Sequence, residues 1–311
     1  MARLFTGLQP SGALHIGNYF GALKPAVEMC ATNDGLVMVA DYHSLTSLTD
    51  VPRRRGYILD VVRDYIGVGL DPHKTILFKQ SDVPEHTELA WIFDCLVTVS
   101  FLELSHAYKD KVAKGLEANA GLFTYPMLMA ADILLYDTDI VPVGADQRQH
   151  VEYAREAAAK FNKTYGTTFK EPKEHILESV AVIPGTDGKK MSKSYKNTIP
   201  LFGTRDEIAA AVMSIVTDSS GERPAFVYAI HRAFKSETEL EKLYDDNKGK
   251  YKILKEALIE DIDSMIAPMR EKRNALTDTE IKVILHDGGE AARALAGNKM
   301  KAVRSNIGVS L

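Results

Sequence analysis

The stretch Gly7-Leu-Gln-Pro-Ser-Gly-Ala-Leu-His-Ile-Gly-Asn18 follows a short apolar run at residues 4–6 and precedes a helical pattern from about Gly17 to Ala31. We interpret it as the turn between a first β-strand and a first helix. Its glycines permit positive φ or the close approach of a ligand, and the unpaired N–H groups of a helix start favour a phosphate. Most Gly-rich turns have no such role, so the interpretation depends on the rest of the chain.

Short apolar or β-branched runs alternate with helical segments as the chain continues. The runs lie at residues 4–6, 36–40, 75–78, 139–143 and 180–183. The helical segments extend over 17–31, from 52 to 67 or 69, from 84 onward, from Pro126 onward, and over 146–162. This alternation predicts an α/β fold, a doubly wound parallel-sheet (Rossmann-like) nucleotide-binding domain, with its ligand beyond the carboxyl ends of the strands.

A helical pattern without strand signals begins after Ser194. Thr204 with Glu207, and Thr277 with Glu280, match the capping box that starts a helix. We therefore expect an α-helical domain to follow the α/β domain.

The later helices divide the rest of the chain. Residues 251–273 form a long amphipathic run that we expect to break near Pro268, and a last helix is expected at about 291–305. The predicted parts are a catalytic domain over 1–200, a helical domain over 201–290, and a C-terminal segment over 291–311 that we expect to dock back on the first domain.

The charge distribution limits the kinds of partner. The net charge of −4 argues against DNA or any nucleic acid held by a broad basic surface. Residues 291–311 nevertheless carry basic residues and no acidic ones, which indicates either an end that faces a polyanion or a solvated helix face. The basic residues are Arg293, Lys299, Lys301 and Arg304.

Other features favour a cytoplasmic protein without a membrane segment. No apolar run approaches the roughly 20 residues that a bilayer span needs, and the first residues lack the pattern of a secretory signal. Cys30 and Cys95 lie far apart, which fits a reducing compartment. The histidines and cysteines show no metal-binding spacing, so we expect no structural metal.

A lysine-rich loop at residues 189–194 is the second chemical feature. Lys189, Lys190 and Lys193 follow a turn-rich run and suit a loop that grips a polyphosphate. Such a loop accelerates a reaction if its charges bind the leaving pyrophosphate more strongly in the transition state. An arbitrary loop of this composition is more often a solvated basic surface.

Two further stretches place polar groups near helix starts. Asp146, in the run Val143-Gly-Ala-Asp-Gln147, is either a ribose-binding carboxylate or a helix N-cap, and the sequence alone leaves both open. Tyr125, Met129 and Asp132 fall on one stripe of a predicted helix. A buried carboxylate needs a partner, and with no cationic neighbour within a turn we expect a ligand N–H to satisfy Asp132.

Together these motifs resemble the bacterial-type tryptophanyl-tRNA synthetases, a family of class I aminoacyl-tRNA synthetases. His15-Ile-Gly-Asn18 resembles the first signature of the class with Asn in place of a final His, and Lys190-Met-Ser-Lys-Ser194 matches the second. Residues 10–12, 130–136 and 141–147 also match in family order and spacing. The resemblance implies ATP-dependent activation of L-tryptophan, with Mg²⁺ accompanying ATP, transfer to tRNA(Trp), and a homodimer.

The resemblance also assigns residues to roles. It implies the catalytic residues His15, Asn18, Lys111, Lys190 and Lys193. It implies the ATP-binding residues Gln9, Pro10, Ser11, Gly17, Asn18, Gly144, Ala145, Asp146, Val182, Ile183, Lys190, Met191, Ser192, Lys193 and Ser194. It implies the tryptophan-binding residues Phe5, Gly7, His43, Tyr125, Met129, Asp132, Val143 and Gln147, with Asp132 on the indole nitrogen.

Two departures concern amino-acid specificity. Tyr42 stands where many members have Gln, and Ala107 stands where many have a Gln that contacts the amino-acid pocket. Ala107 cannot replace those hydrogen bonds. Both departures bear on specificity more than on activation chemistry. The alternatives to a tryptophanyl enzyme are a tyrosyl-tRNA synthetase, a tRNA-independent nucleotidyltransferase of related fold, or a binding protein that has lost catalysis. The stretch 130–136 favours tryptophan, and the helical segment after Thr204 argues against the nucleotidyltransferase.

Overall fold

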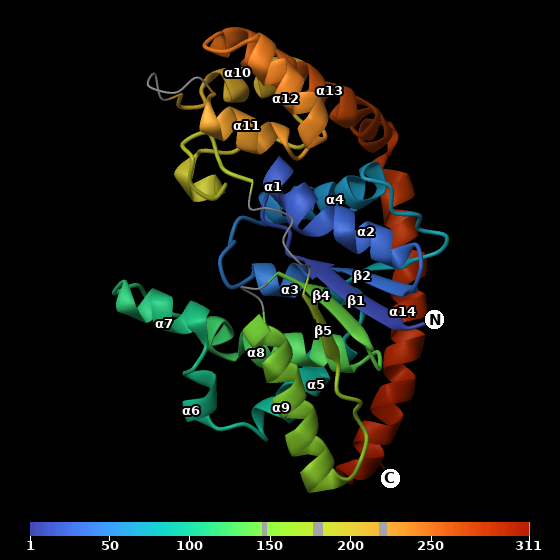
Figure 1. Ribbon diagram of the computed structural model, residues 1–311. Helices are drawn as coiled ribbons and strands as arrows, with labels where there is room; N and C mark the ends of the chain where they lie inside the picture. The colour runs from blue at the N-terminus through green and yellow to red at the C-terminus, as the bar shows by residue number, and fades with distance from the viewer. Residues whose placement is uncertain (145–147, 177–182, 218–222, 311) are drawn as a thin grey trace.

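A computed structural model describes residues 1–144, 148–176, 183–217 and 223–310, and it contains one five-stranded parallel sheet (Figure 1). The strands are β1 (Arg3–Leu8), β2 (Asp34–Val39), β3 (Ile76–Lys79), β4 (Ile140–Val143) and β5 (Lys173–Ile176). Their order is β3-β2-β1-β4-β5, with every pair parallel. Strands β1 to β3 therefore extend towards one edge of the sheet, and β4 and β5 extend from β1 towards the other edge. This order confirms the predicted doubly wound fold.

The sequence missed the last strand. Four predicted runs coincide with β1 to β4, but the described fifth strand is Lys173–Ile176, and residues 180–182 of the predicted run lie outside the described part of the chain. The run Lys173-Glu-His-Ile176 lacks apolar alternation because β5 is an edge strand, and polar residues are typical of a sheet edge.

Helices cover both faces of the sheet. In the first part of the chain they are α1 (Ile16–Asn18), the π-helix η1 (Tyr19–Leu23), α2 (Lys24–Cys30), α3 (Asp41–Ser44), α4 (Val51–Gly67), the 3-10 turn η2 (Gln80–Asp82), α5 (Glu85–Asp94), α6 (Val99–Leu102), α7 (His106–Ala113), α8 (Ala120–Leu134) and α9 (Arg148–Tyr165). The later ones are the 3-10 turn η4 (Lys193–Tyr195), α10 (Arg205–Met213), α11 (Ala225–His231), α12 (Glu237–Asp246), α13 (Tyr251–Ala275) and α14 (Asp278–Asn306). The sequence did not predict α6 and α7.

Helix starts marked by capping boxes were predicted correctly, and so were the starts near Pro52 and Pro84, where α4 and α5 begin. The predicted start at Pro126 and the predicted break near Pro268 were wrong. Both boxes form, at Thr204 for α10 and at Thr277 for α14. In contrast, α8 starts at Ala120, where Asn119 Oδ1 accepts the Leu122 N–H at 2.8 Å, and it contains Pro126. Helix α13 likewise continues through Pro268, with its buried residues before the proline and the partly buried Met269 packed against the first core after it, and this packing outweighs the lost hydrogen bond.

The alternation of side chains along the strands divides the core into two clusters. Leu4 and Val37 point to the face covered by α4 and the helical segment, whereas Phe5 and Leu36 point to the face covered by α5, α8 and α9. The buried side chains of α10, α12 and α13 belong to the first cluster together with sheet residues. Figure 1 shows these helices stacked above α1 and α4, with α5, α8 and α9 on the opposite side of the sheet.

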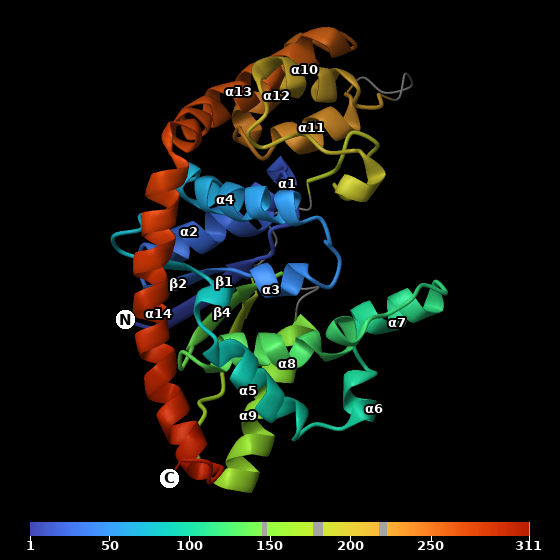
Figure 2. The ribbon, with the colours of Figure 1, turned by 180° about the vertical axis from the view of Figure 1, so that it is seen from behind.

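Helix α14 connects the two layers. Figure 2 shows it running along most of the molecule, and it packs against the edge strand β3. It starts at Asp278, well before the predicted residue 291. Its early residues Ile281 and Leu285 pack in the first cluster, and its later residues, such as Met300, pack in the second. Between them lies Gly288, where an added Cβ would be 2.0 Å from the Leu77 carbonyl oxygen. Only glycine permits this contact between backbones.

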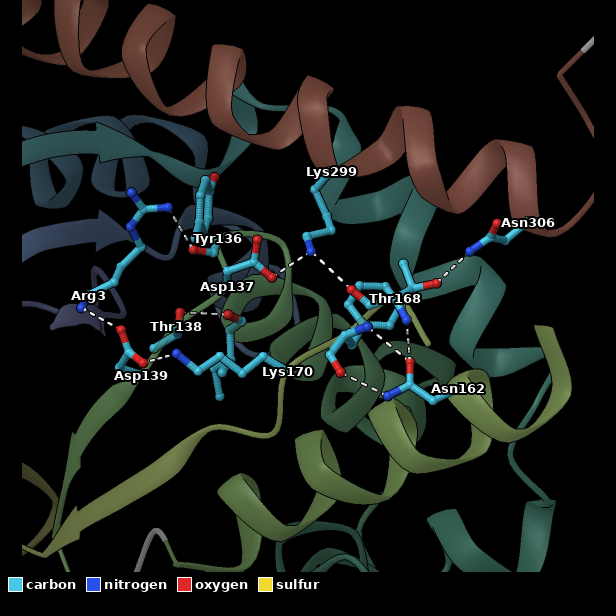
Figure 3. Close-up of polar contacts among 12 residues, drawn as sticks. Arg3, Tyr136, Asp137, Thr138, Asp139, Asn162, Thr168, Lys170, Lys299 and Asn306 are labelled. Carbon is cyan, nitrogen blue, oxygen red and sulfur yellow. Dashed lines mark hydrogen bonds and ion pairs between the residues drawn. The ribbon is translucent and has the colours of Figure 1, made fainter. Parts of the chain in front are cut away.

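The basic residues near the C-terminus pair with carboxylates of the first part of the chain. Lys299 Nζ lies 2.5 Å from Asp137 Oδ1 and donates to the Thr168 carbonyl at 3.1 Å, and Asn306 donates to Thr168 Oγ1 at 2.7 Å (Figure 3). Arg304 donates to Glu88 at 2.7 Å. The same view shows Asp139 joining the β1 backbone to Lys170. These contacts attach α14 to the α/β part, so the expectation of a polyanion-facing or merely solvated end is wrong for Lys299 and Arg304.

None of the helices within the described ranges combines the length and the apolar character needed to cross a bilayer.

We predict that Gly288→Ala strongly destabilises the protein. The new methyl group would overlap the Leu77 carbonyl and push α14 from β3, and overpacking of this kind costs about 1–3 kcal/mol or more. Gly297→Ala in the same helix is the matched control, because nothing lies within 4 Å of its added Cβ. That control is expected to gain up to about 1 kcal/mol from helix propensity. Urea unfolding measures both, and an equal response of the two variants would contradict the proposed close contact.

Candidate active site

The turn after β1 ends in a helix start that fixes two predicted catalytic residues. His15 caps α1, with its backbone N–H donating to Asn18 Oδ1 at 3.1 Å and its Nδ1 accepting the Asn18 N–H at 3.3 Å. Because Nδ1 is an acceptor, the hydrogen of the neutral ring is on Nε2. The capping box therefore orients His15 as a hydrogen-bond donor beside the β1–β4 reversal, where doubly wound sheets bind ligands.

His15 stays neutral over a wide pH range. Burial of the side chain, followed by the positive charge of Lys193, lowers the pKa of His15 to about 4. The residue is 8% exposed. Near neutral pH it can thus donate one hydrogen bond to an anion without bringing a charge of its own.

The lysine-rich loop is held in one conformation by the buried side-chain amide of Asn197, a residue that the sequence did not indicate. Asn197 is 2% exposed; its Oδ1 accepts the Ser192 N–H at 2.8 Å, and its Nδ2 donates to the Lys190 carbonyl at 3.1 Å and to Asp187 at 2.7 Å. Gly185 makes room for it, since an added Cβ there would lie 2.4 Å from Asn197 Nδ2. A single side chain therefore sets the conformation of the whole second motif.

The two motifs meet in space although they lie far apart in the sequence. Lys193 Nζ donates to the carbonyls of Gly12 at 2.9 Å and Ser11 at 3.2 Å. The backbones also pair, with Ile16 N donating to Ile199 O at 3.1 Å. The Lys193 ammonium of the second motif thus contacts the turn of the first motif. An anionic ligand bound at the start of α1 would contact residues of both motifs.

The other predicted ATP-binding residues within the described ranges lie on the turn after β1, on the lysine-rich loop and its approach, or at the end of β4. Gln9 contacts Ser47, and Gly17 packs between His15 and Met191. Ser192 and Ser194 pair through their hydroxyls at 2.8 Å. Pro10, Ile183 and Met191 are buried, Gly144 is half-buried at the end of β4, and Lys190 is exposed. Ala145, Asp146, Gln147 and Val182 lie outside the described residues.

A second cluster, at the carboxyl ends of β2 and β3, surrounds Asp132. This residue is 1% exposed on α8. Its Oδ2 contacts His43 Nε2 at 2.8 Å, and its Oδ1 accepts from Gln80 at 2.8 Å and lies 2.6 Å from His86 Nδ1. We expected a ligand N–H to satisfy Asp132 because no cationic neighbour lies within a turn, but the protein itself supplies partners from elements that are distant in the sequence.

These contacts keep the carboxyl group ionised. Burial by itself would raise the pKa of Asp132, but the charge of His86 and the hydrogen bonds from His43 and His86 outweigh it and lower the pKa to about 2. His86 also contacts the Tyr136 hydroxyl at 2.8 Å. Asp132 is thus the centre of a buried polar network rather than an isolated acid.

Tyr125 and Met129 line the same region as half-buried residues of α8. The Tyr125 hydroxyl contacts His150 Nε2 at 2.9 Å and Ser105 Oγ at 3.2 Å. Ser105 precedes the stretch in which Ala107 departs from the family pattern, so Tyr125 has hydrogen-bonding partners that do not require a Gln at position 107.

The remaining predicted residues are less central. Phe5 is 3% exposed and stacks on Tyr136 in the core, at 5.7 Å between ring centroids. Gly7 is exposed and Val143 is half-buried. Lys111 lies on α7, which has no buried residues and projects away from the sheet in Figure 1, so the structure does not bring it to the motif junction.

Gln80 and His86 were missed for different reasons. Gln80 is a polar residue directly after β3, at the edge where parallel sheets bind ligands, and that signal was available in the sequence. His86 lies in the polar first turn of α5, and only the fold reveals that it faces Asp132.

Known proteins resemble this chain along nearly its whole length. The family described as tRNA synthetases class I (W and Y) matches residues 1–281. The tryptophan–tRNA ligase of Fusobacterium nucleatum is 46% identical, covering 99% of this chain and 98% of that protein. The tryptophanyl-tRNA synthetase of Campylobacter jejuni, solved with ADP and tryptophan, is 42% identical with a TM-score of 0.93, covering 98% of this chain and 99% of that one. The synthetase of Mycoplasma pneumoniae is 30% identical with a TM-score of 0.87, covering 100% and 98%.

We predict that His15 makes the protein less stable below neutral pH. Its folded pKa is depressed, so between pH 7 and 5 the unfolded chain gains a proton at this site that the folded protein does not. Stability then falls with pH, by about 2 kcal/mol between pH 7 and pH 5. Urea unfolding of the native protein and of His15→Gln at both pH values measures the effect. The variant is expected to lose less stability, and identical losses would show that His15 is not protected from protonation.

Proposed function

The chain belongs to the class I tRNA synthetases for tryptophan and tyrosine, and we infer from this membership that it is a tryptophan–tRNA ligase. It activates L-tryptophan with ATP and passes the tryptophanyl group to the 3′ end of tRNA(Trp). The observation that carries this function is the contact of Lys193 with the Ser11 and Gly12 carbonyls, which joins the two motifs into one anion site.

In the first step, a carboxylate oxygen of tryptophan attacks the α-phosphorus of ATP. The bond from that phosphorus to the oxygen bridging to the β-phosphate breaks, and pyrophosphate leaves as tryptophanyl-adenylate forms. No protein nucleophile takes part, so catalysis consists of positioning and charge stabilisation. We assign the donor role to His15 Nε2 with Asn18, and the stabilisation of pyrophosphate to Lys190 and Lys193.

In our proposal, Mg²⁺ enters with ATP as part of the substrate. Within the described residues no group of three or more His, Cys, Asp or Glu side chains is arranged to hold a metal ion. The motif junction presents lysines, which are donors, so the oxygen ligands that Mg²⁺ prefers would come from phosphates and water. Gly17 and Gly144 would admit the nucleotide, and we retain Asp146 for its ribose as a proposal.

We place the tryptophan side chain among His43, Tyr125 and Met129, in front of Asp132. The ring would lie against Met129, and Tyr125 would help to hold the amino group. Support comes from His43, which lies just beyond the carboxyl end of β2, contacts Asp132 and meets the edge of the Tyr125 ring. Gln147 remains a proposed contact from the resemblance.

The partners follow from the same function. We propose that the helical segment 201–290 contacts the anticodon part of tRNA(Trp), and that the protein acts in the cytoplasm. We also propose a homodimer formed through α5 to α7, where Trp91 is 69%, Val99 65% and Leu104 50% exposed. Sedimentation equilibrium tests the dimer, since a Trp91→Lys variant should then be monomeric at concentrations where the native protein is not.

ATP–pyrophosphate exchange with single amino acids, followed by tRNA charging, tests the function. We expect exchange that depends on tryptophan, none with phenylalanine or tyrosine, and charging of tRNA(Trp). Exchange that depends on tyrosine would favour a tyrosyl enzyme. Nucleotide transfer that needs no amino acid would favour a nucleotidyltransferase.

We further predict that Lys193→Ala slows adenylate formation by on the order of 100-fold, because the loss of one transition-state donor typically costs ~2.7–4 kcal/mol. The Kd for tryptophan should change little. Lys196→Asn is the control, because it removes a charge from the same loop and Asn tolerates the left-handed backbone there, where φ is 53°. Single-turnover kinetics separate the two, and an unchanged rate with weaker tryptophan binding would exclude a catalytic role for Lys193.

A further inference from the structure

A cavity of about 600 Å³ opens at the amino ends of β2 and β3. Its walls come from the end of α2, from the end of α4 with the turn that follows it, and from the last turn of α13. The residues of the proposed active site lie beyond the carboxyl ends of the parallel strands, so the cavity is at the opposite end of the sheet. Pockets that bind small molecules typically have volumes of roughly 300–1,000 Å³, and this cavity is within that range.

The floor of the cavity is apolar. Ile66, Leu70 and Cys30 line it and are each at most 4% exposed. Burial raises the pKa of the Cys30 thiol to about 12, so near neutral pH this group is uncharged. At Gly69, where φ is 114°, only Val27 Cγ1 lies within 4 Å of an added Cβ, at 3.9 Å, so the turn after α4 leaves space beside α2. Val68 and Pro72 complete the apolar lining.

Four charged side chains also line the cavity, and three of them are already paired. Glu28 accepts from Lys24 at 2.6 Å, and Lys74 Nζ lies 3.2 Å from Asp71 Oδ2. The fourth, Lys272, is exposed and has no ion pair or hydrogen bond with any residue in the described ranges. The cavity therefore combines an apolar floor with one uncompensated positive charge.

The position of that charge is fixed by the next residue in the chain. Arg273 Nε donates to Asp64 Oδ1 at 2.6 Å, and its Nη2 donates to Asp60 Oδ1 at 2.9 Å. These contacts attach the last turn of α13 to α4, which supplies part of the cavity wall. The backbone that carries Lys272 is thus held beside the cavity before any ligand arrives, and a site formed in advance costs less to occupy.

We propose that this cavity binds a small hydrophobic monoanion, with its apolar body on Ile66 and Leu70 and its anionic group on Lys272. Removal of the apolar body from water drives such binding, and the single free cation favours one negative charge over a neutral or cationic molecule. The site is separate from the proposed function, because it lies at the other end of the sheet and its occupation requires neither ATP nor tryptophan.

Fluorescence of anilinonaphthalene sulfonate tests the site, because this probe is an apolar ring system with one sulfonate. The native protein should bind it even with saturating ADP and tryptophan. Lys272→Gln should weaken binding about fivefold, which corresponds to one charge contact in water. Lys252→Gln is the matched control on the same helix, where the side chain is 81% exposed and does not line the cavity. The uncharged N-phenyl-naphthylamine, which lacks the sulfonate, should bind more weakly than the charged probe and should not respond to Lys272→Gln.

A variant that fills the cavity gives a second test. Ala31→Phe should abolish binding of the sulfonate probe by placing a ring in the cavity from the end of α2, where φ is −64° and any residue is tolerated. Ala291→Phe is the control, at an exposed position of α14 outside the cavity. Methyl NMR of the native protein should show the probe shifting the signals of Ile66 and Leu70.

Four results would overturn the inference. They are displacement of the probe by tryptophan, full binding by folded Ala31→Phe, shifts confined to methyl groups outside the cavity, and equal affinity of the native protein for the charged and the uncharged probe. Lys272→Gln changes an exposed side chain, so this comparison decides the anion preference even if Ala31→Phe does not fold.

Discussion

The backbone contact between Gly288 and the Leu77 carbonyl is the constraint on which the arrangement of the layers depends. An α-helix covers the edge strand β3 there, and its two halves enter the two separate core clusters on opposite faces of the sheet. Because β3 leads directly into Gln80 and then to α5 with His86, the helix that seals the edge also supports the strand that positions the pocket. The polar contacts of Lys299, Arg304 and Asn306 fasten the far half of the same helix.

The anion site depends on a different kind of connection. Lys193 reaches the carbonyls of a turn 181 and 182 residues away, and the backbones pair at Ile16 and Ile199. The helical segment that follows shares its core with the first face of the sheet, so its packing supports the second motif. Asn197 also orders the loop locally, because its side chain accepts the Ser192 N–H and donates to the Lys190 carbonyl.

The cluster around Asp132, where we propose that the amino-acid side chain binds, is organised by electrostatics in the buried interior. Asp132 keeps its charge because two histidines and the Gln80 amide replace the hydrogen bonds of water. A buried network with unpaired polar groups would lower the stability of the protein. Such a network fixes its members in one tautomer and orientation.

The sequence by itself determined the fold class, the four strands β1 to β4, both capping boxes, and the motif residues His15, Asn18 and Lys190 to Ser194, because hydrophobic periodicity, turn residues and local spacing are properties of neighbouring residues. It failed where distant segments meet. Pro126 and Pro268 lie inside helices whose packing outweighs local propensity, and β5 is an edge strand without apolar alternation. The partners of Asp132, the clamp of Asn197 and the close approach at Gly288 were decided only by the tertiary structure, because each depends on which surfaces face one another after the chain has folded.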